Sequence, residues 1–187
     1  MFVAQLADDV HLRILERQDA AQLYALTDAS RDHLRRWLPW LDGTRSVADT
    51  EAFLSGALDQ FASGLGFQAG IWRQGVLCGI AGLHKIDWGN RQSSLGYWIG
   101  AGYEGQGLVT KACSAILDEA FGHYSLHRME LRAALGNERS QAVARRLGFR
   151  REGVLRDAEW LSDHFVDHVV FGLLESEWPE SSDGKRE

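Results

Sequence analysis

The fold of this chain is decided by the stretch Leu95–Phe121, LGYWIGAGYEGQGLVTKACSAILDEAF, which predicts a strand, a turn and a helix in succession. Aromatic and β-branched residues in Leu95–Ile99 suit a half-buried strand. The turn interrupts any regular period with four glycines, Gly100, Gly102, Gly105 and Gly107. Beyond the turn, apolar residues recur with the spacing of one helix face, at Leu108, Val109, Ala112, Cys113, Ile116, Leu117, Ala120 and Phe121.

A turn of this composition is suited to holding an anion. Gly105 and Gly107 lack a Cβ, so a ligand can lie against the backbone. The first N–H groups of the following helix have no intrahelical partner, and the helix dipole adds partial positive charge there. A phosphate fits this position, with the hydroxyl of Thr110 nearby. The same glycines also fit a turn that only reverses the chain, and neither the dinucleotide-binding GxGxxG pattern nor Walker A is present.

The composition indicates a soluble globular protein of one domain. The chain has 187 residues, of which 45% are hydrophobic and 25% charged. Its formal net charge of −6 argues against general binding to nucleic-acid phosphates. No apolar run is long enough to span a membrane, and the N-terminus has no signal-peptide pattern. Cys78 and Cys113 lie in apolar segments, which is typical of buried free thiols in a reducing cytosol, so we expect a cytoplasmic protein.

Further strands and helices are expected on both sides of the opening stretch. Asp19 is expected to cap a helix over residues 20–37, and Ser46 or Asp49 to begin a second one that reaches about Ala62. Asn137 begins a short helix over residues 138–147. Alternating residues predict strands over residues 11–16, 67–72, 76–86, 93–99, 128–135, 149–155 and 164–174. Strands that alternate with helices in this order favour an α/β or α+β domain with a mixed sheet covered on both faces.

Two segments together resemble the GCN5-related N-acetyltransferase (GNAT) superfamily: the YEGQG turn and NERSQAVARRLGF at Asn137–Phe149. The closer resemblance is to its RimL-like branch, which acetylates N-terminal serines of ribosomal proteins. It is carried by LGYWI, by NERS, by LTDASRDHLRRWLPWL at Leu26–Leu41 and by VVFGLLESEW at Val169–Trp178. The resemblance implies the acyl-CoA N-acyltransferase fold, an α+β (α/β/α) sandwich with a mixed, mostly antiparallel sheet of about seven strands that splays at the acyl-CoA site. It implies a single domain over residues 1–178, followed by a polar tail over residues 179–187.

The resemblance further implies transfer of an acetyl group from acetyl-CoA to an amine. The strand ending at Ile99 would separate from the strand over residues 128–135, and the pantetheine arm would pair with main-chain groups of Tyr97, Trp98 and Ile99. The Ile99 amide would stabilise the oxyanion of the thioester. The diphosphate would lie on the backbone N–H groups of Gly105, Gln106, Gly107, Leu108, Val109 and Thr110.

Asn137 and Ser140 have two interpretations. Asn is a strong N-cap and Ser is common in a first helical turn, so a structural role fits both residues. The family pattern instead places both near the sulfur of CoA. There Ser140 would hydrogen-bond or reprotonate the leaving thiolate, and Asn137 would orient the pantetheine arm or a bound water. A covalent acetyl-cysteine is not expected, because Cys113 falls on the apolar stripe of its helix. The resemblance therefore implies direct attack in a ternary complex.

Some positions depart from the family pattern. Ala144 stands where many members have a tyrosine acid, Ser94 where RimL-like relatives often have a glutamate, and Glu104 where an arginine or glutamine is usual. A carboxylate at position 104 would repel a diphosphate unless its side chain points away. The general base stays open, because an α-amine with a pKa of about 7.7–8.0 is already partly neutral at pH 7. The candidate helpers are Glu104, Asp87, His84 and Glu159.

Basic and aromatic residues indicate further contacts. A local excess of arginines could hold the 3′-phosphate of CoA or form a solvated helix face. These arginines are Arg139, Arg145, Arg146, Arg150, Arg151 and Arg156. The acceptor groove of the family implies substrate contacts at Arg35, Arg36, Trp37 and Trp40, although Trp37 could also be core. No metal is expected, because His164 and His168 only share one strand face.

The leading hypothesis is a cytoplasmic, acetyl-CoA-dependent N-acetyltransferase whose acceptor is a protein N-terminal amine, such as that of a ribosomal protein. One alternative keeps the fold and makes the acceptor a small amine, such as an amino acid, a polyamine or an antibiotic. Another is an acyl-CoA-binding module without catalysis, which Ser94, Glu104 and Ala144 would permit. Relatives that pair suggest a homodimer, and neither a membrane nor a direct nucleic-acid partner is expected.

Overall fold

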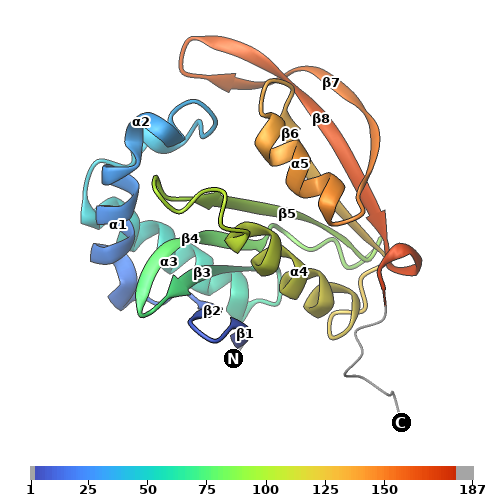
Figure 1. Cartoon of the computed structure of the whole chain (residues 1–187), viewed down its shortest axis with the longest axis horizontal. Helices are drawn as coiled ribbons and strands as arrows, with labels where there is room; N and C mark the ends of the chain where they lie inside the picture. The colour runs from blue at the N-terminus through green and yellow to red at the C-terminus, as the bar shows by residue number, and fades with distance from the viewer. Residues whose placement is uncertain (1–2, 180–187) are drawn as a thin grey trace.

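The computed structural model describes residues 3–179 and is built on one mixed sheet (Figure 1). Its strands are β1 (Val3–Ala7), β2 (Val10–Ile14), β3 (Phe67–Arg73), β4 (Val76–Leu83), β5 (Gln92–Ile99), β6 (Arg128–Ala134), β7 (Arg150–Leu161) and β8 (His164–Leu174). They form an 8-stranded sheet in the order β1-β2-β3-β4-β5-β6-β8-β7. Every neighbouring pair is antiparallel except β5 and β6, which are parallel. The predicted α+β class and the mixed, mostly antiparallel sheet are confirmed, with one strand more than expected.

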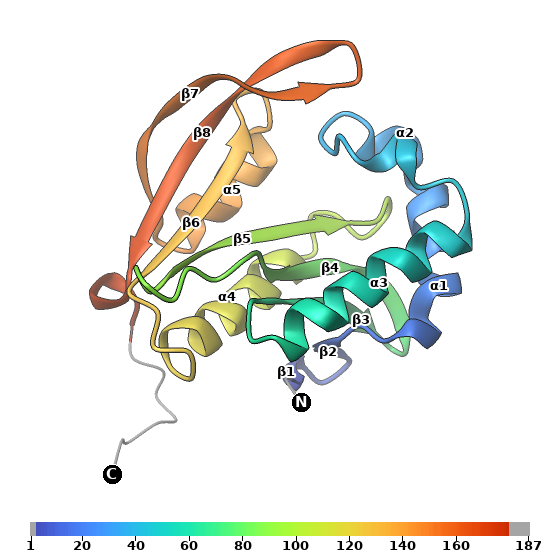
Figure 2. The same ribbon diagram turned by 180° about the vertical axis from the view of Figure 1, so that it is seen from behind.

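Helices cover both faces of this sheet. They are α1 (Ala20–Ala29), α2 (Arg31–Leu34), α3 (Val47–Ala62), α4 (Leu108–Phe121) and α5 (Glu138–Arg146). Figure 1 shows α4 in front of the sheet, and Figure 2 shows α3 in front from the opposite side. The buried apolar stripe of α4 packs on Phe67 and Ile71, whereas Leu54 of α3 belongs to a second cluster with Leu77 and Ile80. None of the helices in residues 3–179 is long and apolar enough to cross a membrane.

The helix expected over residues 20–37 is interrupted. The backbone of Ser30 leaves the helical conformation, with φ −106° and ψ 8°, so that α1 and α2 are separate. The Ser30 hydroxyl accepts the N–H of Ala101 in the glycine turn at 2.9 Å. Asp19 does precede α1, but its carboxylate does not cap the helix and instead accepts hydrogen bonds from Arg13 and the backbone of Glu16. By contrast, Ser46 caps α3 as predicted by accepting the N–H of Asp49.

The two ends of the chain also differ from the expectation. β1 was not predicted, because its partly exposed residues give only a weak alternation. β7 continues to Leu161 rather than ending at Leu155, through a register shift between Leu155 and Glu159. The polar tail expected over residues 179–187 lies, apart from Pro179, outside the described residues.

β5 and β6 are joined only at their beginnings. Residues 92–94 of β5 pair with residues 128–130 of β6, and after Ser94 the two strands separate, as both ribbon views show. The opposite edge of β5 stays paired with β4 from Leu95 to Ile99. The sheet therefore has one open edge in its middle, and this edge positions the candidate site.

Candidate active site

The diverging strands border a cleft of about 1870 Å³. Its walls come from the segment around α2, from β5, from the glycine turn and the start of α4, and from β6, α5, β7 and β8. Tyr97 and Trp98 point to opposite faces of β5, because Tyr97 packs with the α4 cluster and Trp98 with the α3 cluster. Residues from both faces of the sheet line the cleft, among them Thr50 on the α3 side and Thr110 on the α4 side.

The register of β5 shows which main-chain groups are free. In an antiparallel pair, hydrogen-bonded and non-hydrogen-bonded residue pairs alternate. The N–H of Gly100 donates to Cys78 and the N–H of His84 donates to Ser94, so the even-numbered residues of β5 face β4. The odd-numbered residues Tyr97 and Ile99 consequently turn their N–H and C=O groups to the gap. The expected strand contact is therefore available at Tyr97 and Ile99, whereas the main chain of Trp98 is directed to β4.

The glycine turn has the backbone conformation that the sequence indicates. Gly102, Gly105 and Gly107 have φ values of 86°, 73° and 73°, in the left-handed region that other residues rarely adopt. Gly107 is the N-cap of α4 and carries no side chain, so no side-chain cap bond is made at this helix start. The N–H groups at the first turn of α4 thus remain for a ligand. Gly105, Gly107, Val109 and Thr110 all lie in the cleft wall.

The other two residues expected at the turn direct their side chains elsewhere. Leu108 is buried in the core. Gln106 donates to the carbonyl of Gly102 and accepts a hydrogen bond from Arg73 at 2.6 Å. Only their backbone groups are therefore placed to take part, which is what the sequence predicted for them.

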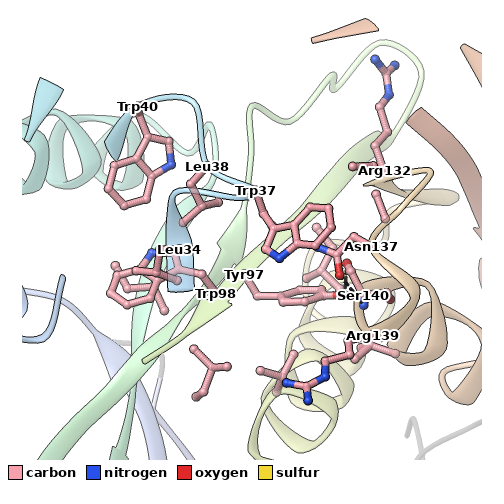
Figure 3. A pocket seen from close by; sticks show the side chains of 18 of the residues that line it. Leu34, Trp37, Leu38, Trp40, Tyr97, Trp98, Arg132, Asn137, Arg139 and Ser140 are labelled. Carbon is pink, nitrogen blue, oxygen red and sulfur yellow. Dashed lines mark hydrogen bonds between the residues drawn. The ribbon is translucent and has the colours of Figure 1, made fainter. Parts of the chain in front are cut away.

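Ser140 of α5 faces Tyr97 of β5 in the cleft (Figure 3). The Ser140 and Tyr97 hydroxyls are 2.8 Å apart, and the Tyr97 hydroxyl also lies 3.1 Å from the Ser140 carbonyl oxygen. Burial raises the pKa of Tyr97, and the neighbouring Cys113 adds to this effect, so the phenol stays protonated at neutral pH. Sequence reasoning assigned Tyr97 only a main-chain role, because the contact joins residues 43 positions apart. Ala144, at the position of the usual tyrosine acid, is buried in the core.

Asn137 has the structural role that was one of its two interpretations. Its Oδ1 accepts the N–H of Ser140 at 3.1 Å, so it caps α5. The same bond fixes the backbone of Ser140 next to Tyr97. Asn137 also lines the cleft.

Tryptophans line one side of the cleft, where the family resemblance implied the acceptor. Trp37, Trp40 and Trp98 line it, and the rings of Trp40 and Trp98 have centroids 6.2 Å apart. Trp37 extends toward Asn137 (Figure 3), and its ring lies 3.9 Å from the position that a Cβ on Gly136 would take. Arg35 does not line the cleft; it forms an exposed ion pair with Asp42 at 3.0 Å. Arg36 lines a smaller pocket beside the β7–β8 hairpin.

Three of the four candidate proton acceptors line the cleft. His84 lies beside Ser94, with Nδ1 2.9 Å from the Ser94 Oγ, and desolvation lowers the pKa of its imidazole. Glu159 lies 3.3 Å from His168 Nε2. Glu104 accepts the N–H of Gly102, which holds the pKa of its carboxyl below the ordinary value against the opposing effect of burial. Asp87 does not line the cleft and instead accepts hydrogen bonds from Asn90.

The arginines separate into two groups. Arg139 and Arg146 line the cleft, and Arg146 donates to the Thr110 hydroxyl at 3.2 Å. The remaining arginines of the segment do not line it: Arg145, Arg150, Arg151 and Arg156. The candidates for a CoA phosphate are thus reduced to the pair beside the start of α4.

Comparison with known proteins identifies the family. The acetyltransferase (GNAT) domain matches residues 9–150. YdaF of Bacillus subtilis (strain 168), which bears the name of a ribosomal N-acetyltransferase, is 37% identical over 180 residues, covering 95% of this chain and 98% of YdaF.

Solved structures agree in fold. The structure of RimL, a ribosomal L7/L12 α-N-protein acetyltransferase in complex with coenzyme A, superposes with a TM-score of 0.89 at 22% identity, covering 92% of this chain and 98% of RimL. The microcin C7 self-immunity acetyltransferase MccE, in complex with acetyl-CoA and AMP, gives a TM-score of 0.85 at 25% identity, covering 90% of this chain and 94% of that one. The splayed sheet, the domain match and the similarity to YdaF over nearly the whole chain lead to one conclusion: this protein belongs to the GNAT family of N-acetyltransferases.

Proposed function

We propose that this protein transfers the acetyl group of acetyl-CoA to the α-amine of a protein N-terminus, with cytoplasmic ribosomal proteins as the acceptor class. The observation that carries the proposal is the open edge of β5 next to the start of α4, which has no side-chain cap. Both lie in a cleft lined by residues from the two faces of the sheet. The name of YdaF and the RimL complex with coenzyme A support the acceptor class and the cosubstrate.

Acetyl-CoA fits the residues at the open edge. The pantetheine amides would pair with the free groups of Tyr97 and Ile99, as an added strand does. The diphosphate would lie on the N–H groups from Gly105 to Thr110, where the helix dipole favours negative charge. Arg139 and Arg146 lie in the same wall and would supply the positive charge for the 3′-phosphate.

The chemistry is a direct attack of the neutral amine on the thioester carbonyl. A carbon–nitrogen bond forms, negative charge develops on the carbonyl oxygen, and the N–H of Ile99 stabilises it. The carbon–sulfur bond then breaks, and Ser140, hydrogen-bonded to the Tyr97 hydroxyl, passes a proton to the thiolate and takes up through water the proton that the amine releases. The amine loses its proton to water or to a carboxylate or imidazole of the cleft wall, where Glu159 and His168 face each other.

A small molecule with a planar group is a second candidate acceptor. The aromatic wall of Trp37, Trp40 and Trp98 could stack on such a group. The structure of MccE in complex with acetyl-CoA and AMP supports this second candidate.

One assay separates these acceptors. Release of the CoA thiol is measured with a panel of peptides that begin with the N-terminal sequences of ribosomal proteins, and with a panel of amino acids, polyamines and aminoacyl nucleotides. We expect turnover with peptides, and mass spectrometry should find one acetyl group on the N-terminal residue. Turnover with the small amines alone would replace the protein acceptor by the second candidate, and binding of CoA without release on any acceptor would contradict both.

The assembly is part of the proposal. We expect a homodimer, and light scattering coupled to size-exclusion chromatography measures its mass directly. A monomeric mass at the concentrations of the assay would contradict this expectation.

A further inference from the structure

Glu104 makes contacts that its place in the cofactor turn does not require. Its Oε2 accepts the N–H of Gly102 at 2.9 Å. Its Oε1 lies 3.3 Å from Nδ1 of His33 and 3.5 Å from the guanidinium of Arg139. The Glu104 side chain is 25% exposed and the His33 side chain 30%, so this contact is partly shielded from water. The Arg139 side chain is 83% exposed, and its contribution is correspondingly small.

These contacts join three parts of the cleft that have different proposed roles: α2, α5 and the glycine turn. His33 belongs to α2, the single helical turn that precedes Trp37 and Trp40 of the acceptor wall. Arg139 precedes Ser140 on α5. Glu104 itself lies between the free strand edge and the start of α4. One carboxylate thus lies at the meeting point of the acceptor wall, the cofactor turn and the helix that carries the candidate acid.

α2 has few other bonds to the sheet side of the cleft. The hydroxyl of Ser30 accepts the N–H of Ala101, again from the glycine turn. Arg31 instead donates to carbonyls of Leu41 and Thr44 in the segment that follows α2. Burial of Leu34 anchors α2, and its contacts through Ser30 and His33 tie it to the turn that would hold the diphosphate, so the position of Trp37 depends in part on this turn.

We infer that Glu104 is a positioning residue for the acceptor, which holds α2 against the cofactor turn through His33 and thereby sets the place of the acceptor wall. The inference rests on the proposed acetyl transfer. A carboxylate next to the diphosphate site weakens CoA binding through repulsion. Glu104 accordingly acts on the two substrates in opposite directions, favouring the acceptor and disfavouring the cosubstrate. A residue that only stabilised the turn would favour both.

The test measures both substrates in the same variants. In Glu104→Ala, we expect the KM of the acceptor to rise about tenfold, the size of one lost charge-assisted hydrogen bond. The Kd of CoA, measured by calorimetry, should stay equal or fall, and kcat at saturation should change little. Glu104→Gln keeps an acceptor for the N–H of Gly102 and should give an intermediate KM. Asp59→Ala, which removes an exposed carboxylate from α3, is the charge-matched control and should change neither value.

His33 provides the second arm of the test. His33→Ala should raise the KM of the acceptor and leave the Kd of CoA unchanged. In the double variant with both substitutions, the KM of the acceptor should be no higher than in Glu104→Ala alone, because the effects of residues that act as one unit are not additive. An acceptor KM within about twofold of the parent in Glu104→Ala would overturn the inference, as would a parallel loss of CoA affinity and acceptor affinity. Absence of acetyl transfer by the parent protein would instead overturn the proposed function, so the two failures are distinguishable.

Discussion

In the proposed mechanism, the hydroxyl pair of Tyr97 and Ser140 lies where the leaving thiolate would be protonated. Ser140 alone would be a weak acid, but its oxygen lies 2.8 Å from a phenol whose pKa is raised by burial. The phenol therefore keeps its proton at neutral pH, and the two hydroxyls share a hydrogen bond in which either can be the donor. In the proposed mechanism, Tyr97 of β5 would act through Ser140, where many family members carry a tyrosine near position 144.

Ser140→Ala removes the proton donor and should lower kcat. We expect a fall of about tenfold, smaller than is usual for a general acid, because a thiol with a pKa of about 8.5 leaves readily. The Kd of CoA should stay within about twofold, since the main chain and not this hydroxyl is proposed to hold the arm. Tyr97→Phe, which keeps the ring and loses only the hydroxyl, should lower kcat in the same direction. An unchanged kcat in Ser140→Ala would remove this residue from the mechanism.

Cys113→Ala should leave the chemistry intact. The thiol is fully buried among core residues of α4, and this burial raises its pKa, so it does not form a thiolate nucleophile. We expect kcat within about twofold of the parent and a loss of about 1 kcal/mol in the free energy of unfolding from the small cavity. Loss of turnover in a variant with native circular dichroism would contradict direct attack.

At the scale of elements, the glycine turn is the part whose backbone is most constrained. Gly107 has φ 73°, and a Cβ there would meet no atom within 4 Å. The glycine is therefore needed for its conformation and for the open surface, and not to avoid a clash within the protein. A side chain at this position would point into the space that the diphosphate is proposed to fill.

Gly107→Ala should therefore weaken CoA binding more than it weakens the fold. The left-handed backbone conformation costs about 1–2 kcal/mol with a Cβ present. Gly75→Ala is a matched control, because Gly75 has φ 77° and equally open surroundings in the β3–β4 turn, away from the cleft. Both variants should lose similar free energy of unfolding in urea, and only Gly107→Ala should raise the Kd of CoA. Equal Kd values in the two variants would contradict a diphosphate on this turn.

The sequence correctly predicted the helices and strands in which many residues follow one hydrophobic pattern. The apolar stripe of α4 predicted its residues, and alternation predicted β8 from His164 to Leu174 as found. The break between α1 and α2 could not be predicted, because it coincides with a hydrogen bond from Ala101, a residue distant in sequence. Asp19 was assigned a cap because the local pattern does not show that Arg13 binds its carboxylate.

The backbone parts of the candidate site could be predicted from the sequence, whereas the contacts between its side chains could not. The turn and the open edge follow from glycine positions and from the family pattern, and the register adds that only alternate residues of β5 face the gap. The Tyr97–Ser140 pair, the His84–Ser94 contact and the contacts of Glu104 with His33 and Arg139 all depend on tertiary packing. Arg35, assigned to the acceptor groove by position, is instead directed to Asp42.

At the scale of the whole molecule, Arg13 and Asp19 connect the sheet to the helical layer. Both oxygens of Asp19 accept bonds from the guanidinium of Arg13 at 2.8 Å, and Arg13 also lies 4.0 Å from the centroid of the Trp72 ring. Burial alone would raise the pKa of Asp19, but the bonds from Arg13 and the Glu16 N–H outweigh it and lower the value. The ionised form is therefore favoured in the folded state.

This pair predicts a loss of stability in acid. A carboxyl with a lowered folded pKa contributes stability above its unfolded pKa of about 3.9, and loses it as the pH falls through the folded value. Asp19→Asn should be less stable than the parent by about 1–3 kcal/mol at pH 5–7, because Arg13 then keeps a partly buried charge without its partner. The difference should shrink below about pH 4, as measured by urea unfolding at each pH. A difference that stays constant down to pH 2 would contradict the assignment.

The separation of β5 from β6 also predicts how fast the amide hydrogens of β5 exchange with solvent. The amides of Tyr97 and Ile99 face the gap between β5 and β6, whereas the amide of Trp98 between them is directed to β4. Deuterium should consequently enter this strand in an alternating profile, fast at Tyr97 and Ile99 and slow at Trp98. If coenzyme A binds there as an additional strand, it should slow exchange at Tyr97 and Ile99 to the rate of Trp98. Residue-resolved hydrogen exchange by NMR measures these rates and would detect bound coenzyme A without any acceptor present.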